Sequence, residues 1–147
     1  MNKDAKIIGV WGGRGSGKST RTKELIEKNN RVIVFDPIGD YAQEREFTGY
    51  KTLKGLYKAI KQNWNKGFRV VLTVPRGNDP KTVLEQLADA LFIIQKPYYD
   101  GQEKRKITLV VEEMSLSYPE KTLGKAERSF LELINIGRHY GVEIIGV

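Results

Sequence analysis

Short apolar runs rich in β-branched residues alternate along the chain with segments whose apolar residues recur every three or four positions. The first pattern is typical of buried strands and the second of amphipathic helices. Strands are expected at residues 7–11, 31–35, 69–74, 107–111 and 142–147. Helices are expected at residues 18–29, from Leu53, from Pro80, and through 126–137. This alternation predicts an α/β domain in which helices flank a mainly parallel central sheet.

Two of the expected helices carry clear start signals. Thr52 stands directly before the apolar periodicity of the second helix and is suited to cap it. Asp79 and Pro80 place a capping residue and a first-turn proline ahead of the third. Residues 96–106 are polar and turn-prone, which predicts a surface loop. No repeat or linker interrupts residues 1–147, so we expect a single domain.

Composition narrows the classes of protein to consider. The chain has no apolar stretch near the roughly 18 residues that cross a membrane, and its first residues lack the pattern of a secretion signal. An intracellular setting is therefore expected. The absence of cysteine excludes disulfides and thiolate metal sites. A net charge of +7 favours a polyanionic partner such as nucleic acid, although a solvated basic surface is the alternative.

The strongest chemical signal lies between the first expected strand and helix. The pattern G-x-x-x-x-G-K-[ST], called Walker A, is satisfied by Gly12, Gly13, Arg14, Gly15, Ser16, Gly17, Lys18 and Ser19. Glycines allow the backbone N–H groups to curl around phosphates at the start of a helix. Lys18 would reach the β- and γ-phosphates, Ser19 would bind Mg2+, and Thr20 would support the helix start. We therefore predict a site for ATP and Mg2+.

A second signal is the pair of carboxylates after the strand at 107–111. Ligands gather at the carboxyl ends of parallel strands, so Glu112 and Glu113 should face the same crevice as the phosphate loop. Glu112 would hold Mg2+, and Glu113 would orient or deprotonate the attacking water. The two roles are interchangeable at this stage. A charged strand end that merely meets solvent is the alternative.

Asp36 follows the second expected strand in the same way. Near the phosphates, its carboxylate would hydrogen-bond the catalytic water or a water on Mg2+. The sequence Asp36-Pro37 followed by Gly39-Asp40 is also a simple turn former. Local chemistry leaves both interpretations open.

Together these segments resemble the HerA/FtsK superfamily of DNA-pumping ATPases. Within it, the sequence is most similar to the small genome-packaging ATPases of tailless bacteriophages with internal membranes. The discriminating segments are D-P-x-G-D-Y at 36–41 and G-R-H-Y-G-V at 137–142, because Walker motifs are shared by many proteins. The resemblance implies a three-layer P-loop NTPase of the additional-strand type. Members also carry a polar residue, usually glutamine, after the last strand, whereas this chain stops at Val147, which leaves open a shortened chain or a degenerate member.

The resemblance also implies an activity and partners. It implies ATP hydrolysis coupled to translocation of double-stranded DNA by a homo-oligomeric ring, a pentamer or hexamer, at a capsid vertex protein. Host cytoplasm or the virion would be its location. Arg138 would stabilise γ-phosphate charge, in its own or a neighbouring subunit, although a helix-terminal arginine that binds the last carbonyls is the alternative. A P-loop kinase and a non-enzymatic nucleotide-binding assembly factor are the rival functions.

Overall fold

The computed structural model describes residues 7–10, 18–39, 41, 46–112 and 128–147, with the side chains of Lys18 and Ser19 excepted. Adjacent strands in this part are all parallel and follow the order β1-β6-β5-β2-β4-β3. The strands are β1 (Ile7–Gly9), β2 (Arg31–Asp36), β3 (Thr48–Tyr50), β4 (Phe68–Thr73), β5 (Ile107–Val111) and β6 (Val142–Gly146). One strand, β6, therefore separates the strand before the phosphate loop from the strand before the two acids.

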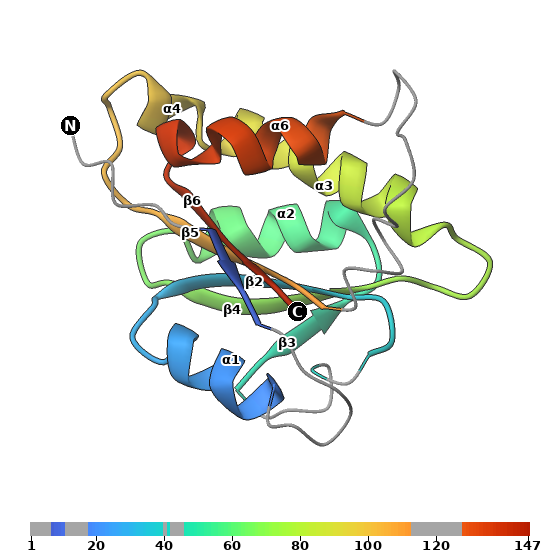
Figure 1. Ribbon diagram of the computed structural model, residues 1–147. Helices are drawn as coiled ribbons and strands as arrows, with labels where there is room; N and C mark the ends of the chain where they lie inside the picture. Colours follow the sequence, from blue (N-terminus) through green and yellow to red (C-terminus); the bar gives the residue numbers. More distant parts are fainter. Residues whose placement is uncertain (1–6, 11–17, 40, 42–45, 113–127) are drawn as a thin grey trace.

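Helices cover both faces of the sheet and complete three layers (Figure 1). Helix α1 (Lys18–Ile26) lies on one face, and α2 (Leu53–Gln62), α3 (Pro80–Ile94) and α6 (Ser129–Ile136) lie on the other. A short helix α4 (Lys96–Tyr99) and a 3-10 helix η2 (Gly137–Tyr140) complete the described elements. The predicted additional-strand α/β fold is confirmed. None of the described helices combines the length and the apolar character needed to cross a bilayer.

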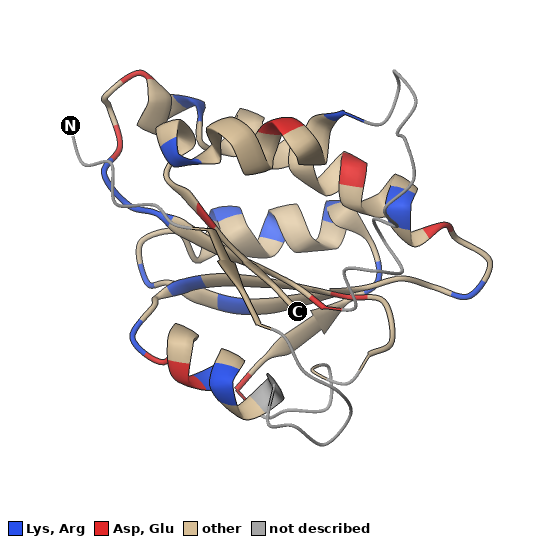
Figure 2. Ribbon diagram, viewed as in Figure 1, with Lys and Arg blue, Asp and Glu red and all other residues tan. Residues whose placement is uncertain are grey.

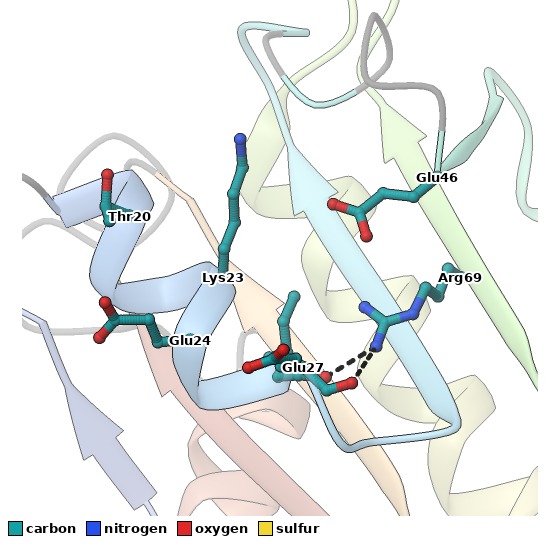
Figure 3. A pocket seen from close by; sticks show the side chains of 7 residues that line it. Thr20, Lys23, Glu24, Glu27, Glu46 and Arg69 are labelled. Carbon is teal, nitrogen blue, oxygen red and sulfur yellow. Dashed lines mark hydrogen bonds between the residues drawn. The ribbon is translucent and has the colours of Figure 1, made fainter.

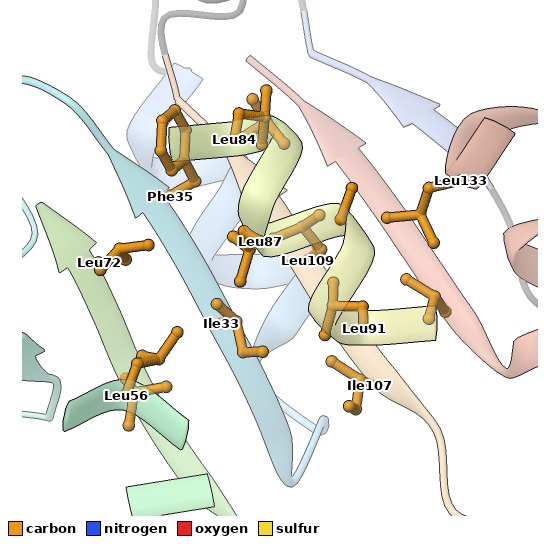
Figure 4. Close-up of a cluster of buried hydrophobic side chains, with 14 of the residues drawn as sticks. Ile33, Phe35, Leu56, Leu72, Leu84, Leu87, Leu91, Ile107, Leu109 and Leu133 are labelled. Carbon is orange, nitrogen blue, oxygen red and sulfur yellow. The ribbon is translucent and has the colours of Figure 1, made fainter. Parts of the chain in front are cut away.

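The core follows from strands that are apolar on both faces. On β2, Val32 and Val34 face the α1 side, whereas Ile33 and Phe35 join the cluster under α3. Figure 4 shows this second cluster, in which side chains of the central strands meet one face of α3. Burying each large aliphatic side chain contributes about 1.5–3 kcal/mol. A continuous apolar run therefore marks a strand covered on both sides, as parallel sheets require.

The expected helix starts are confirmed by their hydrogen bonds. The Thr52 hydroxyl accepts from the Gly55 N–H at 3.1 Å, and the Asp79 carboxylate accepts from the Lys81 N–H at 3.3 Å. One further cap is long-range and was not expected: the Glu85 carboxylate of α3 accepts the Ser129 N–H at 2.7 Å. That bond ties the first turn of α6 to α3, which it packs against.

Three local expectations differ from the structure. The first strand ends at Gly9, and Trp11 lies outside the described residues. Strand β3 was missed because three residues are too few to show a period. Residues 96–99 form α4 rather than loop, since Pro97 fits the first turn of a helix and the buried Gln95 amide donates to the Arg105 carbonyl at 3.0 Å.

Gly141 fixes the way in which the chain enters β6. Its φ of 65° lies in the left-handed region, and a Cβ there would come within 2.6 Å of the Tyr98 ring. The Gly141 carbonyl also accepts the Ile107 N–H at 2.9 Å, at the start of β5. Only glycine satisfies both the backbone angle and the aromatic contact.

The segment between α4 and β5 is organised by Glu103. Its carboxylate accepts the Lys104 and Arg105 N–H groups at 3.0 Å, the Arg105 Nε at 2.8 Å and the Trp64 indole N–H at 3.0 Å. These donors, the Arg105 guanidinium foremost, hold the pKa of Glu103 well below its ordinary value of 4.5. Charge on Glu103 therefore stabilises the folded state.

A Glu103→Gln variant is expected to lose about 1–2 kcal/mol of unfolding free energy at pH 7, because five N–H groups lose a charged acceptor partly open to solvent. A carboxyl whose pKa is depressed on folding contributes stability above its unfolded pKa and loses it as pH falls towards the folded value. The difference from wild type should be constant above about pH 5 and shrink below the ordinary glutamate pKa. Urea unfolding between pH 3 and 8 measures it, and a difference that grows on acidification would contradict the assignment.

Candidate functional site

The carboxyl edge of the sheet carries the candidate site. Pairing continues past the strand ends through three backbone hydrogen bonds: Val10 N–H to Gly146 O at 2.8 Å, Val147 N–H to Val111 O at 2.9 Å, and Glu112 N–H to Phe35 O at 2.9 Å. These bonds align the segment that leads into the phosphate loop with Glu112 and Asp36 along one edge. Two strand spacings, about 9–10 Å, separate β1 from β5. The predicted convergence of the acidic strand end on this edge is thus seen for Glu112.

Part of the predicted site lies outside the described residues. The described residues do not include Gly12, Gly13, Arg14, Gly15, Ser16, Gly17 or Glu113. Lys18 and Ser19 begin α1, as the motif requires, and Thr20 is exposed in the same turn. The amino end of α1 therefore follows directly on the predicted loop, while the contacts of Lys18, Ser19 and Glu113 stay predictions.

Asp36 is buried at the end of β2, with 1% of its surface exposed. Its Oδ1 accepts the Gly39 N–H at 3.0 Å, and its Oδ2 accepts the Tyr41 N–H at 2.8 Å. Gly39 has φ of 96°, so the turn after β2 uses a conformation that glycine favours. These contacts support the turn-forming interpretation of Asp36. A role at the nucleotide stays a prediction.

An Asp36→Ala variant is expected to lower the free energy of unfolding by about 2–4 kcal/mol, because two backbone N–H groups lose a buried charged acceptor. Asp79→Ala is the matched control, since it removes an exposed helix cap and should cost only about 1 kcal/mol. Urea unfolding of both variants measures the difference. Equal, small losses would show that the Asp36 contacts do not hold this turn.

Glu112 lies at the same edge, nearly buried, beside two polar groups that sequence reasoning missed. The Tyr41 phenol lies near enough to the Glu112 carboxylate and to Thr22 of α1 for both to shift its pKa, while its buried hydroxyl has no hydrogen bond of ordinary geometry within the described part of the chain. Burial, and then the neighbouring Glu112 carboxylate, raise the pKa of the Tyr41 phenol above its ordinary value. Tyr41 therefore stays neutral, and its phenol lies near both the phosphate-loop helix and the acidic strand end. Its place in the D-P-x-G-D-Y segment was the available signal.

The donor set at this edge fits Mg2+ in its chemistry. Magnesium prefers oxygen ligands and commonly takes one or two from protein beside the phosphates. Glu112 supplies a carboxylate at the strand end, and Ser19 is a residue of the first turn of α1. Within the described residues, no group of three His, Cys, Asp or Glu side chains could hold a metal ion unaided. A metal here would depend on phosphate oxygens and water for its other ligands.

Arg138 is placed at the opposite edge of the sheet. It is exposed on η2, directly before β6 begins, whereas the site lies where parallel β5 ends. The chain therefore does not bring Arg138 and the phosphate loop together within one subunit. Gly141 closes η2 by donating its N–H to the Arg138 carbonyl at 3.3 Å.

A hollow of about 530 Å³ runs beside α1, between that helix and the start of β3 (Figure 3). Both acidic and basic side chains line the hollow. The Arg69 guanidinium donates hydrogen bonds to the carbonyls of Ile26 and Asn29 at 2.8 and 3.0 Å. Arg69 thus caps the carboxyl end of α1. Thr20 lines the hollow, together with Lys23, Glu24, Ile26, Glu27, Glu46 and Arg69. Of the predicted site residues whose side chains the structure describes, only Thr20 lines it.

Comparison with known proteins supplies three kinds of relative. A family described as "Helicase HerA, central domain" matches residues 2–117. A uridine kinase of Clostridium tetani (strain Massachusetts / E88) is 24% identical over 141 residues, which is 92% of this chain and 61% of the kinase. The chain thus spans about three fifths of that relative.

The fold is also similar to solved structures of the genome packaging NTPase B204 from Sulfolobus turreted icosahedral virus 2. The complex with AMPPCP matches 99% of this chain with a TM-score of 0.63, and the complex with ATP-gammaS matches 100% with 0.60. Sequence identity is 19% in both, and this chain covers 65% of that protein. At this identity the likeness is one of fold.

Proposed function

Because the chain belongs to the HerA central-domain family, we propose that it binds ATP with Mg2+ and hydrolyses it to move double-stranded DNA into a viral capsid. The fold is that of a P-loop NTPase. The observation that carries the proposal is the arrangement of the carboxyl edge. There a single strand, β6, separates β1, which precedes the phosphate loop, from β5, which Glu112 follows. Binding of ATP analogues by the B204 protein supports the choice of nucleotide.

Each site residue then has a definite task. The backbone of residues 12–17 cradles the phosphates, and Lys18 binds the β- and γ-phosphate oxygens. Ser19 and Glu112 hold the magnesium ion, which neutralises phosphate charge when it is bound. Glu113 orients and deprotonates the attacking water. The buried Tyr41 phenol lies beside Glu112 and limits the access of bulk water to its carboxylate.

The proposed assembly is a homo-oligomeric ring, a pentamer or hexamer, working at a capsid vertex protein in host cytoplasm or on the virion. The placement of Arg138 supports a ring. A guanidinium at the amino edge of one subunit can reach phosphates only at the carboxyl edge of another. Subunits packed edge to edge would complete each other's sites.

The proposal is tested by the ATPase rate of the full chain with and without duplex DNA, together with its mass in solution. DNA should raise the rate, and the stimulated species should be an oligomer. A rate that duplex DNA leaves unchanged, at low salt and saturating ATP, would exclude coupled translocation while leaving ATP hydrolysis in place.

A Lys18→Ala variant is expected to lower kcat/KM for ATP about 10²–10³-fold, because a preorganised charge on the transferring phosphoryl group is removed. Steady-state kinetics with purified protein measure the loss. Lys23→Ala, five residues further along α1, is the control and should stay near wild-type activity. Equal rates for wild type and Lys18→Ala would identify the activity as a contaminant and favour a non-enzymatic assembly factor.

Phosphoryl transfer to a small acceptor is the second candidate, and similarity to a uridine kinase favours it. Both functions use the same phosphate loop, but they differ in the nucleophile. Acidic residues at the end of β5 favour water, whereas a kinase uses the acceptor hydroxyl. Incubation with ATP and uridine decides: formation of a uridine phosphate would establish the kinase, and inorganic phosphate alone would establish the hydrolase.

A further inference from the structure

The amino edge of the sheet, opposite the phosphate loop, contains a polar groove of about 290 Å³. At about 30 Å³ per water molecule, it has room for roughly ten waters or one hydrated phosphate group. It lies where β2, β5 and β6 begin and is lined by Lys28, Asn29, Asn30, Arg31, Lys104, Lys106, Thr108 and Glu143. We call it the amino-edge groove.

The charge of the amino-edge groove is strongly positive. Four cationic side chains line it against one carboxylate, Glu143, which stands 4.0 Å from the Lys106 ammonium. Among the described residues, no carboxylate lies within ion-pair distance of the exposed Lys28 and Lys104 ammonium groups. Figure 2 shows Lys and Arg at the start of β2 and ahead of β5, and Asp and Glu where β2 and β5 end, although an acidic residue also stands at the start of β6. The groove is thus suited to an anion.

Arg31 gives the groove a fixed positive charge. Its Nε and Nη2 donate to the Trp64 carbonyl at 2.9 and 2.7 Å, and its guanidinium lies 5.4 Å from the centre of the Trp64 ring. Carbonyls orient a guanidinium without cancelling its charge. Burial, and then the nearby Arg105, lower the pKa of Arg31 below its ordinary value, as expected where cations crowd together.

No aromatic side chain of the described residues lines the groove, and two tyrosines of the neighbouring helices α4 and η2 are engaged with each other. Tyr99 stacks on Tyr140 with ring centres 4.8 Å apart, and the Lys96 ammonium lies 4.7 Å from the Tyr99 ring. The Arg105 guanidinium binds the Glu103 carboxylate, so only Lys104 and Lys106 of the segment 104–106 line the groove as cations. Recognition by base stacking needs open aromatic faces, whereas recognition of backbone phosphates needs only cations.

The groove also lies apart from Arg138. Thr108 pairs with Val32 and with Glu143, which places all three on the face of the sheet that α1 covers. Arg138 belongs to η2, which packs against α6 on the other face. A subunit contact made through Arg138 therefore leaves the α1 side of this edge open to a further partner.

We propose that the amino-edge groove binds a backbone phosphate of duplex DNA, so that DNA and ATP occupy opposite edges of one sheet. The inference rests on the proposed function, since DNA is the polyanion named there. Contacts limited to phosphates would make binding independent of sequence and strongly dependent on salt. Strands β2 and β5 run from one edge to the other, so they would connect the DNA site with the ATP site.

Binding of a labelled duplex by the full chain, followed by fluorescence anisotropy across a salt series, tests the groove. Lys28→Ala/Lys104→Ala is expected to bind about tenfold or more weakly at low salt, with the slope of log affinity against log salt reduced by about 1–2. Lys54→Ala/Lys58→Ala is the matched control, because it removes two exposed lysines from α2 on the other face. It should bind as wild type does.

The outcomes separate this inference from the proposed function. If both double variants lose the same DNA affinity, or neither loses any, the groove is not the DNA-binding site. Binding of duplex by wild type would still support DNA as the partner. Failure of wild type to bind duplex at low salt would overturn both. Urea unfolding midpoints that match wild type exclude misfolding as the cause of a loss.

Discussion

A Glu113→Gln variant is expected to bind ATP as tightly as wild type and to hydrolyse it about 10²–10⁴-fold more slowly. Glutamine keeps the size and a hydrogen bond to water but cannot accept its proton. Because Mg2+ and phosphates are held by other groups, binding should survive while the chemical step fails. Single-turnover hydrolysis, with ATP affinity measured separately, distinguishes the two.

Glu112→Gln is the matched control for that experiment, since it makes the same change one residue earlier. Glu112 follows β5 directly and is a proposed magnesium ligand, so its loss should affect the magnesium requirement rather than the proton transfer. We expect a raised magnesium concentration for half-maximal rate, with turnover recovering as magnesium increases. If Glu112→Gln stays inactive at saturating magnesium and Glu113→Gln stays active, the two roles are exchanged.

The framework of the fold was predictable because its signals are local. The four apolar residues of 32–35 alternate between the two covered faces, so their continuous run predicts a buried strand. Thr52 and Asp79 cap helices through amides two or three residues ahead. Interactions between residues within one helical turn of each other can be predicted from the sequence alone.

The missed features depend on partners far away in sequence. Arg31 binds the Trp64 carbonyl 33 residues later, and Arg69 binds the carbonyl of Ile26, 43 residues earlier. Nothing near either arginine indicates that carbonyls will hold it. Glu85 caps α6 across 44 residues in the same way. Such contacts appear only once the packing of the elements is known.

The candidate site was predicted in part. The parallel topology alone places Glu112 and Asp36 at the edge where strands end, as expected. Sequence could not decide between the two interpretations of Asp36, because both use the same carboxylate at the same strand end. The hydrogen bonds to Gly39 and Tyr41 give it a structural task. Topology also requires that Arg138, before β6, lie at the other edge, and this position is the reason that its proposed role is placed between subunits.

An Arg138→Ala variant is expected to reduce ATPase turnover about 10³–10⁵-fold while leaving each subunit's own nucleotide site intact. An arginine that neutralises charge on the transferring phosphoryl group acts mainly in the transition state, so ATP affinity should change little. Arg138→Lys should retain part of the rate, since it keeps the charge but loses the planar fork of donors. Steady-state kinetics of both variants, at protein concentrations that keep the ring assembled, measure the effect.

Mixing subunits shows whether Arg138 acts between them. Arg138→Ala subunits keep complete sites, and Glu113→Gln subunits keep a normal Arg138, so each alone is inactive. In a mixed ring, a Glu113→Gln subunit would supply its arginine to the intact site of an Arg138→Ala neighbour and restore hydrolysis there. Activity should therefore rise with mixing and peak at an intermediate ratio. Rings that mix without regaining activity would place the guanidinium's effect within its own subunit, which the opposite-edge position of Arg138 argues against.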